Sequence, residues 1–297
     1  MKQLIIIKQS VTLLGYLMTK ILIGVPTLNG SERLERCIRA LIHNTNFSKF
    51  DTKILIADDG STDENIILNK NVVHNLSTDY YPIQMLYGQG RTGIASTWNR
   101  LTKHFGDWPD IVVLINDDVE VVKDWLDALV FSLVNNPKIG MLGLNTYCGL
   151  TDGQLTVNPP IVDYIESNIL LGNGMLVSAH GPIFGFRKAV YNEIGGFDER
   201  YFCFYEEVDF GVALRYNGYI NAMLSYPICF HMGGATNSEP KNLNAQQCMS
   251  ESKQKFHAKW KLSLDELRNI FKIDGEKVRR HDFVNVEWNT QIKNWTD

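Results

Sequence analysis

Four short, continuously apolar runs divide the first half of the chain, and a segment with helical spacing follows each of them. The runs cover residues 21–25, 54–57, 83–87 and 111–115. Runs this short and this apolar are typical of strands that are buried on both faces of a sheet. In the segment after the first run, Leu34, Ile38 and Leu41 recur at helical spacing. The alternation predicts an α/β fold with a mostly parallel central sheet and helices on both faces.

The pattern changes near residue 146, where short strands, loops and glycines replace the regular alternation. Further helices are predicted over residues 94–105, 125–134, 188–193 and 208–216. Ser61 and Glu64 have the spacing of a capping box and predict where another helix begins. Beyond residue 240 the chain is polar, which predicts one long helix and a charged tail.

These patterns divide the chain into four parts. Lys8 and Gln9 interrupt an apolar stretch near the N-terminus, which leaves it too short to span a bilayer. We therefore interpret residues 1–17 as an extension that precedes the fold. The remaining parts are a first half over residues 18–145, a second half over residues 146–240 and a tail over residues 241–297.

Charge and cysteine content narrow the functional classes. The 297 residues include 29 basic and 33 acidic side chains that are intermixed, so the chain lacks the basic stripe that binding to a nucleic-acid backbone requires. The five cysteines are scattered without a C-x-x-C pair, which argues against a disulfide framework and against a structural zinc site. We expect a protein of the reducing cytoplasm with at most peripheral membrane contact.

Polar and acidic residues follow the predicted strands, at the edge where parallel α/β sheets bind ligands. These segments are residues 26–29, 58–61, 88–93 and 116–118. In the last of them, the adjacent carboxylates of Asp117 and Asp118 repel each other unless a cation or hydrogen-bond donors compensate them. A hard divalent cation takes oxygen ligands and shares them with substrate phosphates, so this pair indicates a metal site. The alternative is an Asx turn at the end of a strand.

A second acidic cluster, Glu206, Glu207 and Asp209, lies where a helix is predicted to begin. Acidic residues stabilise helix N-termini, so the cluster has a purely structural alternative. Its aromatic neighbours Tyr205 and Phe210 would half-bury it and raise the pKa of one carboxyl toward that of a general base.

His231 ends an apolar run directly before two glycines. A single histidine is more often structural, but it could share a metal with the upstream acidic pair. An imidazole beside carboxylate and phosphate oxygens suits Mn²⁺ better than Ca²⁺.

Residues 88–93 match the G-x-G-x-x-G pattern and offer a competing interpretation as a dinucleotide-binding loop, with Asp117 as the ribose-binding acid. That pattern follows the third predicted strand instead of the first, and it leaves both acidic clusters and His231 without a role.

Taken together, these segments resemble the GT-A fold glycosyltransferases of family 2, and in particular the rhamnosyltransferase-like group, over about residues 20–235. The matching motifs are VPTLNG, IADDGSTDEN, GRTGIASTWN, NDD, GGFDERYFCFYEEVDF and HMGG. The sequence departs from the family pattern at Glu207, where an aspartate is usual, and at Arg91, where an asparagine is usual.

The resemblance implies an inverting transfer of a sugar from a UDP-, dTDP- or GDP-linked donor to a hydroxyl of a saccharide or glycan. It implies that residues 18–145 bind the donor and that residues 146–240 bind the acceptor. Asp118 and His231 would hold Mn²⁺ or Mg²⁺, and Glu207, with Glu206 as the alternative, would act as base. The donor-binding residues would be Pro26, Thr27, Asn29, Asp58, Arg91, Gly93, Asn99, Asn116 and Asp117. The acceptor-binding residues would be Trp98, Tyr205 and Asp209. A nucleotide-sugar-binding module without activity is the remaining alternative.

Overall fold

The computed structural model describes residues 19–88, 90–149, 155–157, 164–166, 169–171, 182–232, 244–263 and 265–267. The predicted extension over residues 1–17 lies outside them. The strands are β1 (Lys20–Thr27), β2 (Asp51–Asp58), β3 (Ile83–Leu86), β4 (Ile111–Ile115), β5 (Val119–Glu120), β6 (Ile139–Gly149), β7 (Leu155–Val157), β8 (Tyr164–Glu166), β9 (Ile169–Leu171), β10 (Ile183–Arg187) and β11 (Ile220–His231). The helices are α2 (Ser31–Asn44), α3 (Asp63–Leu76), α4 (Ile94–Lys103), α5 (Trp125–Asn135), α6 (Lys188–Ile194), α7 (Glu206–Tyr216) and α8 (Ala245–Trp260).

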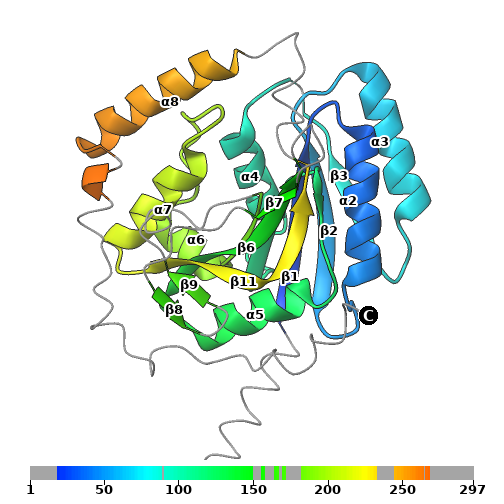
Figure 1. The fold of residues 1–297 in the computed structure, drawn as a ribbon. Helices are drawn as coiled ribbons and strands as arrows, with labels where there is room; N and C mark the ends of the chain where they lie inside the picture. The colour runs from blue at the N-terminus through cyan, green and yellow to red at the C-terminus, as the bar shows by residue number, and fades with distance from the viewer. Residues whose placement is uncertain are drawn as a thin grey trace, which may run out of the picture.

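One sheet joins both halves of the chain (Figure 1), in the order β3-β2-β1-β4-β10-β6-β11-β9-β8. The strands β3, β2, β1 and β4 pair in parallel. β10 runs antiparallel to both β4 and β6, and β11 is parallel to β6, so β6 and β11 point in the same direction as the first four strands. The prediction of a mostly parallel sheet is confirmed. The boundary predicted after residue 145 falls inside β6, so the two halves share this sheet.

Helices cover both faces of the sheet, as the sequence predicts. Alternate residues of β1 enter different cores: Ile21 and Ile23 pack with α2 and α5, whereas Leu22 packs with α4, α6 and α7. Because neither face meets solvent, Ile21 to Thr27 are all buried, which is why this strand reads as a continuous apolar run.

Most predicted elements are present, with bounds that differ from the predicted ones by up to three residues: β2 begins three residues earlier than predicted, and α4 ends two residues earlier. β4 spans residues 111–115, as predicted. The capping box of Ser61 and Glu64 is wrong by one residue: the Thr62 side chain caps α3 by accepting a hydrogen bond from the backbone N–H of Asn65. The Ser61 hydroxyl instead accepts a 2.8 Å hydrogen bond from the backbone N–H of Asn29, which links the loops after β1 and β2.

The tail contributes the helix α8, which runs beside α7 at the opposite end of the molecule from α2 and α3 (Figure 1). Phe256 of α8 is fully buried and shares a small core with Tyr201 and Val212. In the described part of the chain, no helix combines the length and the apolar character that a membrane crossing requires.

Candidate functional site

The acidic pair lies in the turn between β4 and β5. The carboxylate of Asp117 is buried and accepts a 2.7 Å hydrogen bond from the Thr27 hydroxyl at the end of β1. The Arg33 guanidinium, from the first turn of α2, lies 3.5 Å from the other carboxylate oxygen. Burial raises the pKa of Asp117 to about 6, while Arg33 and Thr27 act in the opposite direction because both stabilise the charged form. Asp117 is therefore mostly ionised at neutral pH.

Asp118 and His231 meet although they are far apart in the sequence. β5 pairs with the end of β11, which sets His231 opposite Val119. The backbone N–H of Met232 also donates a 3.0 Å hydrogen bond to the Asp118 carbonyl oxygen. As a result, His231 Nε2 lies 3.3 Å from Asp118 Oδ1, and the two side chains are 18% and 9% exposed. The pair is shielded from most of the solvent without being closed off.

The geometry of this pair fits a small divalent cation. Two adjacent ligands of an octahedral ion, each at about 2.1 Å, lie about 3 Å apart, which is close to the separation of the Asp118 and His231 atoms. Within the described residues, no group of three or more His, Cys, Asp or Glu side chains could hold a metal. The protein would thus supply two ligands and leave the other positions to water or phosphate oxygens, as Mg²⁺ and Mn²⁺ accept.

Two aspartates shape the loop after β2. Asp58 is fully buried, and its Oδ1 accepts 2.9 Å hydrogen bonds from the backbone N–H groups of Gly60 and Ser61. Asp59 reaches the next loop, where its Oδ1 accepts hydrogen bonds from the N–H and the hydroxyl of Thr92, both at 2.8 Å. Asp58 therefore shapes the loop, and its predicted contact with the donor stays a prediction.

The other donor residues predicted on β1 and β4 also lie at this edge of the sheet. Pro26 lies beside Ala57 in the pairing of β1 with β2. Asn29 adopts a positive φ of 48°, and its side-chain oxygen accepts a 2.9 Å hydrogen bond from the Thr62 N–H. The N–H of Asn116 donates to the Pro182 carbonyl at 2.8 Å. Their contacts with a donor stay predictions.

Arg91 and Gly93 lie in the loop between β3 and α4, which packs against the segment before α7. The Arg91 guanidinium lies 5.2 Å from the centre of the Phe202 ring. Gly93 has a φ of +91°, and a Cβ atom there would lie 2.5 Å from the Phe202 carbonyl oxygen. That oxygen accepts a 2.9 Å hydrogen bond from the Ile94 N–H. Gly93 thus permits close contact between two chain segments, which differs from the phosphate cradle of the dinucleotide-binding alternative.

The second acidic cluster lies at the start of α7. Burial, and then the charge of Glu207, raise the pKa of Glu206 well above its ordinary value. Glu206 Oε2 is buried without a hydrogen-bond partner among the described residues.

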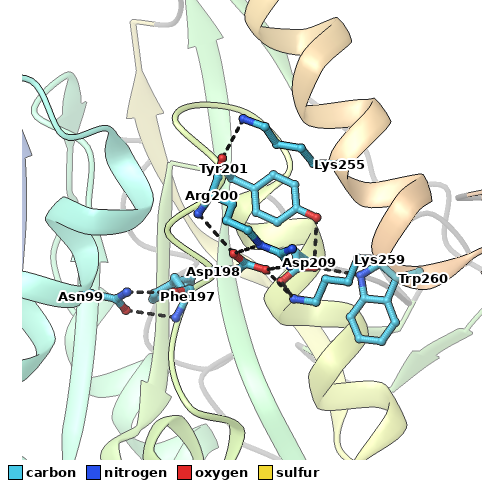
Figure 2. A network of polar contacts seen from close by, with 9 residues as sticks. All are labelled: Asn99, Phe197, Asp198, Arg200, Tyr201, Asp209, Lys255, Lys259 and Trp260. Carbon is cyan, nitrogen blue, oxygen red and sulfur yellow. Dashed lines mark hydrogen bonds and ion pairs between the residues drawn. The ribbon is translucent and has the colours of Figure 1, made fainter.

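Asp209 points toward α8 (Figure 2), and its predicted contact with an acceptor stays a prediction. Its Oδ2 lies 2.6 Å from Lys259 Nζ. Its Oδ1 accepts hydrogen bonds from Trp260 Nε1 at 2.8 Å and from the Tyr201 hydroxyl at 3.2 Å. Both carboxylate oxygens are therefore engaged within the protein.

Two further predicted site residues lie on α4. Trp98 is 5% exposed and packs edge-on against Phe184, with ring centres 5.2 Å apart. The side-chain nitrogen of Asn99 donates to the Phe197 carbonyl at 2.8 Å, and its oxygen accepts from the Phe197 N–H at 3.0 Å and from the Tyr191 hydroxyl at 2.6 Å. Asn99 therefore holds the segment before α7, and the predicted contacts of Trp98 with an acceptor and of Asn99 with a donor stay predictions.

Tyr205 directly precedes Glu206, and its ring packs 5.2 Å from that of Phe256 on α8. Its predicted contact with an acceptor stays a prediction. Sequence reasoning missed Asp59, Arg33, Lys259 and Trp260. Asp59 and Arg33 could have been predicted, because Asp59 lies in the polar segment after the second predicted strand and Arg33 follows the polar segment after the first. The polar pattern of the tail gave no such indication for Lys259 and Trp260.

The profile of the family described as "Glycosyl transferase family 2" matches residues 22–195, more than half of the chain. The chain belongs to this family. It is therefore a glycosyltransferase, as the resemblance implied, and the dinucleotide-binding alternative is excluded. The matched region of this family 2 glycosyltransferase includes Asp117 and Asp118 but ends before Glu206 and His231, whose placement rests on the structure.

Known proteins similar to this family 2 glycosyltransferase include an N-acetylglucosaminyl-diphospho-decaprenol L-rhamnosyltransferase of Mycobacterium tuberculosis (strain ATCC 25618 / H37Rv). The two are 24% identical over 246 residues, which cover 72% of this chain and 76% of the relative. The crystal structure of S. aureus TarS 1-349 with UDP-GlcNAc has a TM-score of 0.64 at 14% identity, covering 89% of this chain and 72% of that one.

The mannosyltransferase PcManGT of Pyrobaculum calidifontis, in complex with GDP-Man and Mn²⁺, has a TM-score of 0.52 at 15% identity. The match covers 71% of this chain and 56% of that one, so the family 2 chain spans just over half of the mannosyltransferase. At such low identity, the similarity to solved structures shows the fold alone. The predicted GT-A fold is confirmed.

Proposed function

We propose that this family 2 glycosyltransferase moves a sugar from a nucleotide-diphosphate donor to an acceptor hydroxyl, with inversion at the anomeric carbon and with Mn²⁺ or Mg²⁺. The observation that carries this proposal is the 3.3 Å separation of His231 Nε2 and Asp118 Oδ1 beside the buried Asp117. Support comes from the Mn²⁺ in the similar mannosyltransferase structure.

In this proposal, Asp118 and His231 hold the metal at the carboxyl edge of the sheet. When bound, the cation supplies positive charge that offsets the charge of the departing diphosphate. Thr27 and Arg33 keep Asp117 oriented, and Asp117 accepts hydrogen bonds from the donor. Arg91 has a buried Nε atom without a hydrogen-bond partner among the described residues, so its guanidinium is suited to the nucleotide end of the donor.

Glu207 is the proposed base. It removes the proton from the acceptor hydroxyl as the hydroxyl oxygen bonds to the anomeric carbon and the bond from that carbon to the diphosphate oxygen breaks. In this proposal the proton goes to Glu207, the position at which the family resemblance places the base. Tyr205 directly precedes Glu206 in the chain and is the proposed acceptor contact.

The partners are also proposals. The donor is a UDP-, dTDP- or GDP-linked sugar, and the acceptor is a saccharide or glycan, which the name of the mycobacterial relative supports because it describes a sugar on a diphospholipid. We propose that the enzyme works in the cytoplasm, with at most peripheral contact with a membrane that carries such an acceptor.

The test is a panel of UDP-, GDP-, dTDP- and CDP-linked sugars, each with Mn²⁺ or with EDTA. We expect one nucleotide class to raise the melting temperature with Mn²⁺ only, and its sugar to be transferred or hydrolysed. Asp118→Ala should abolish the Mn²⁺-dependent stabilisation, whereas Asp79→Ala, which changes an exposed aspartate, should not. Stabilisation without turnover would indicate a binding module, and an unchanged response in Asp118→Ala would contradict the metal site.

A further inference from the structure

One face of α8 rests on the segment from Phe197 to Tyr205, which leads into the acidic start of α7 (Figure 2). The Ser252 hydroxyl donates a 2.7 Å hydrogen bond to the Cys203 carbonyl, and Lys255 Nζ donates a 2.8 Å hydrogen bond to the Arg200 carbonyl. Phe256, Lys259 and Trp260 continue the contact. These five residues of α8 recur at spacings of three and four, so they form a single stripe along the helix.

Lys259 forms ion pairs with two carboxylates. Its Nζ lies 2.6 Å from Asp209 Oδ2 on α7 and 2.9 Å from Asp198 Oδ2 in the preceding segment. The Asp209 side chain is 4% exposed, so it is expensive to leave without a cation. Trp260 adds a hydrogen bond from Nε1 to the same carboxylate and stacks on Tyr216, with ring centres 5.2 Å apart.

The same segment is fixed at its other side by α4. Asn99 of α4 makes two hydrogen bonds to the backbone of Phe197, which are visible in Figure 2. The Phe202 carbonyl accepts the hydrogen bond from Ile94 at the start of α4. The segment is thus held between α4 and α8, and α8 supplies the contacts nearest to α7.

The backbone that joins this segment to α7 is strained. Phe204 and Tyr205 have φ angles of 64° and 71°, in the left-handed region, which residues other than glycine adopt only at an energetic cost. Two such residues in succession persist only when their surroundings hold them. Glu206 and Glu207 follow immediately, so the position of both carboxyls depends on the contacts that maintain this turn.

We propose that Lys259 and Trp260 are positioning residues for the transfer reaction: by holding Asp209 and Asp198, they fix the turn that presents Glu206 and Glu207 to the acceptor. The inference deepens the proposed function and rests on it. The contacts of Asp118 with His231 and of Asp117 with Thr27 do not involve α8. Loss of the contacts that Lys259 and Trp260 make therefore lowers turnover and leaves nucleotide binding intact.

The test compares Lys259→Met, Lys259→Arg and Lys253→Met. The last changes an exposed lysine of the same helix that takes no part in these contacts. With the donor that the panel selects, Lys259→Met should lose up to about 100-fold in kcat, because displacements near 1 Å can cost that much. Its Kd for UDP or GDP with Mn²⁺ should stay within about twofold. Lys259→Arg should restore most of the turnover. A wild-type kcat in Lys259→Met, or equal losses in kcat and in nucleotide affinity, would overturn the inference.

Two additions keep the test decisive. If Lys259→Met does not fold, Trp260→Phe keeps an aromatic ring in place of the larger indole and removes the N–H that binds Asp209. Amide hydrogen exchange over residues 197–207 needs no substrate, and it should quicken in Lys259→Met or Trp260→Phe but not in Lys253→Met. Unchanged exchange in this segment would refute the positioning role even if no donor is turned over, whereas absence of turnover in the wild type would refute only the proposed function.

Discussion

Glu206 is a buried carboxyl whose pKa links the stability of the protein to pH. Its ionised form loses hydration and meets the charge of Glu207, so its pKa lies well above the ordinary value of 4.5. A carboxyl with a raised pKa stays protonated where the unfolded chain has already ionised. The folded state therefore loses stability as the pH rises from the unfolded pKa toward the folded one.

We accordingly predict that Glu206→Gln stabilises the protein more at pH 8 than at pH 5. Glutamine has nearly the same shape as the protonated acid and cannot ionise, so the pH-dependent loss disappears. The measurement is the free energy of unfolding in urea at both pH values, with Glu64→Gln, which changes an exposed glutamate, as control. A stability gain that is equal at both pH values would mean that Glu206 does not titrate as described.

Glu207 yields a kinetic prediction at the same scale. If it is the base, Glu207→Gln should lower kcat by about 10²–10⁴-fold, the usual contribution of a positioned base, with little effect on the Kd of UDP or GDP with Mn²⁺. Glu207→Asp, which restores the residue usual in the family, should keep more turnover than the glutamine variant. Unchanged turnover in Glu207→Gln would rule out Glu207 and favour Glu206 as the base.

How far residue roles could be predicted from sequence depended on where each side chain finds its partners. Asp118 and His231 were expected to act together, and the pairing of β5 with β11 brings them within 3.3 Å. The family resemblance implied an acceptor contact for Asp209, which stays a prediction. Its partner in the structure, Lys259, lies in a tail whose polar pattern does not indicate what it packs against.

At the scale of elements, the loop between β3 and α4 is as constrained as the strands. Gly93 combines a φ of +91° with a space in which an added Cβ would lie 2.5 Å from the Phe202 carbonyl oxygen. We predict that Gly93→Ala destabilises the protein by clearly more than Gly106→Ala. Gly106 also has a positive φ, of 57°, but an added Cβ would meet nothing within 4 Å.

Gly106→Ala therefore isolates the backbone cost, about 1–2 kcal/mol, and the excess in Gly93→Ala measures the clash with Phe202. Chemical unfolding of both variants gives the comparison. Because the Gly93 loop touches the segment before α7, Gly93→Ala should also lower kcat, whereas Gly106→Ala should not. Equal destabilisation would mean that the loop can move away from Phe202 at no cost.

In the first half, β1 and β4 were predictable because they are buried on both faces, and α2 was predictable because its buried residues form one apolar stripe. β1 and β4 consist almost wholly of buried residues, so no other secondary structure competes for them. The start of α7 was placed two residues late, since Glu206 and Glu207 lack the apolar spacing of a helix and enter it through the strained turn at Tyr205. That turn depends on contacts with α8, which local sequence does not report.

At the scale of the whole molecule, stability is distributed unevenly between the sheet and α8. The central strands lie between two large cores, whereas α8 buries only Ser252 and Phe256 and is attached through one stripe of side chains. Units with so little buried apolar surface commonly open separately, at a lower free energy than global unfolding. Yet this weakly attached helix holds the segment that carries Tyr205 and leads to Glu206.

We therefore predict that α8 opens in a sub-global step before the sheet. In native-state hydrogen exchange at low denaturant, the amides of α8 should open at a lower free energy than those of β1 and β4, and residues 198–205 should open together with α8. The coupling follows from the hydrogen bonds of Ser252 and Lys255 to the backbone of that segment. A single opening free energy for α8, β1 and β4 would show one cooperative unit. Opening of residues 198–205 independently of α8 would show that the contacts with α4 alone hold the turn. Lys259 could then not act as a positioning residue.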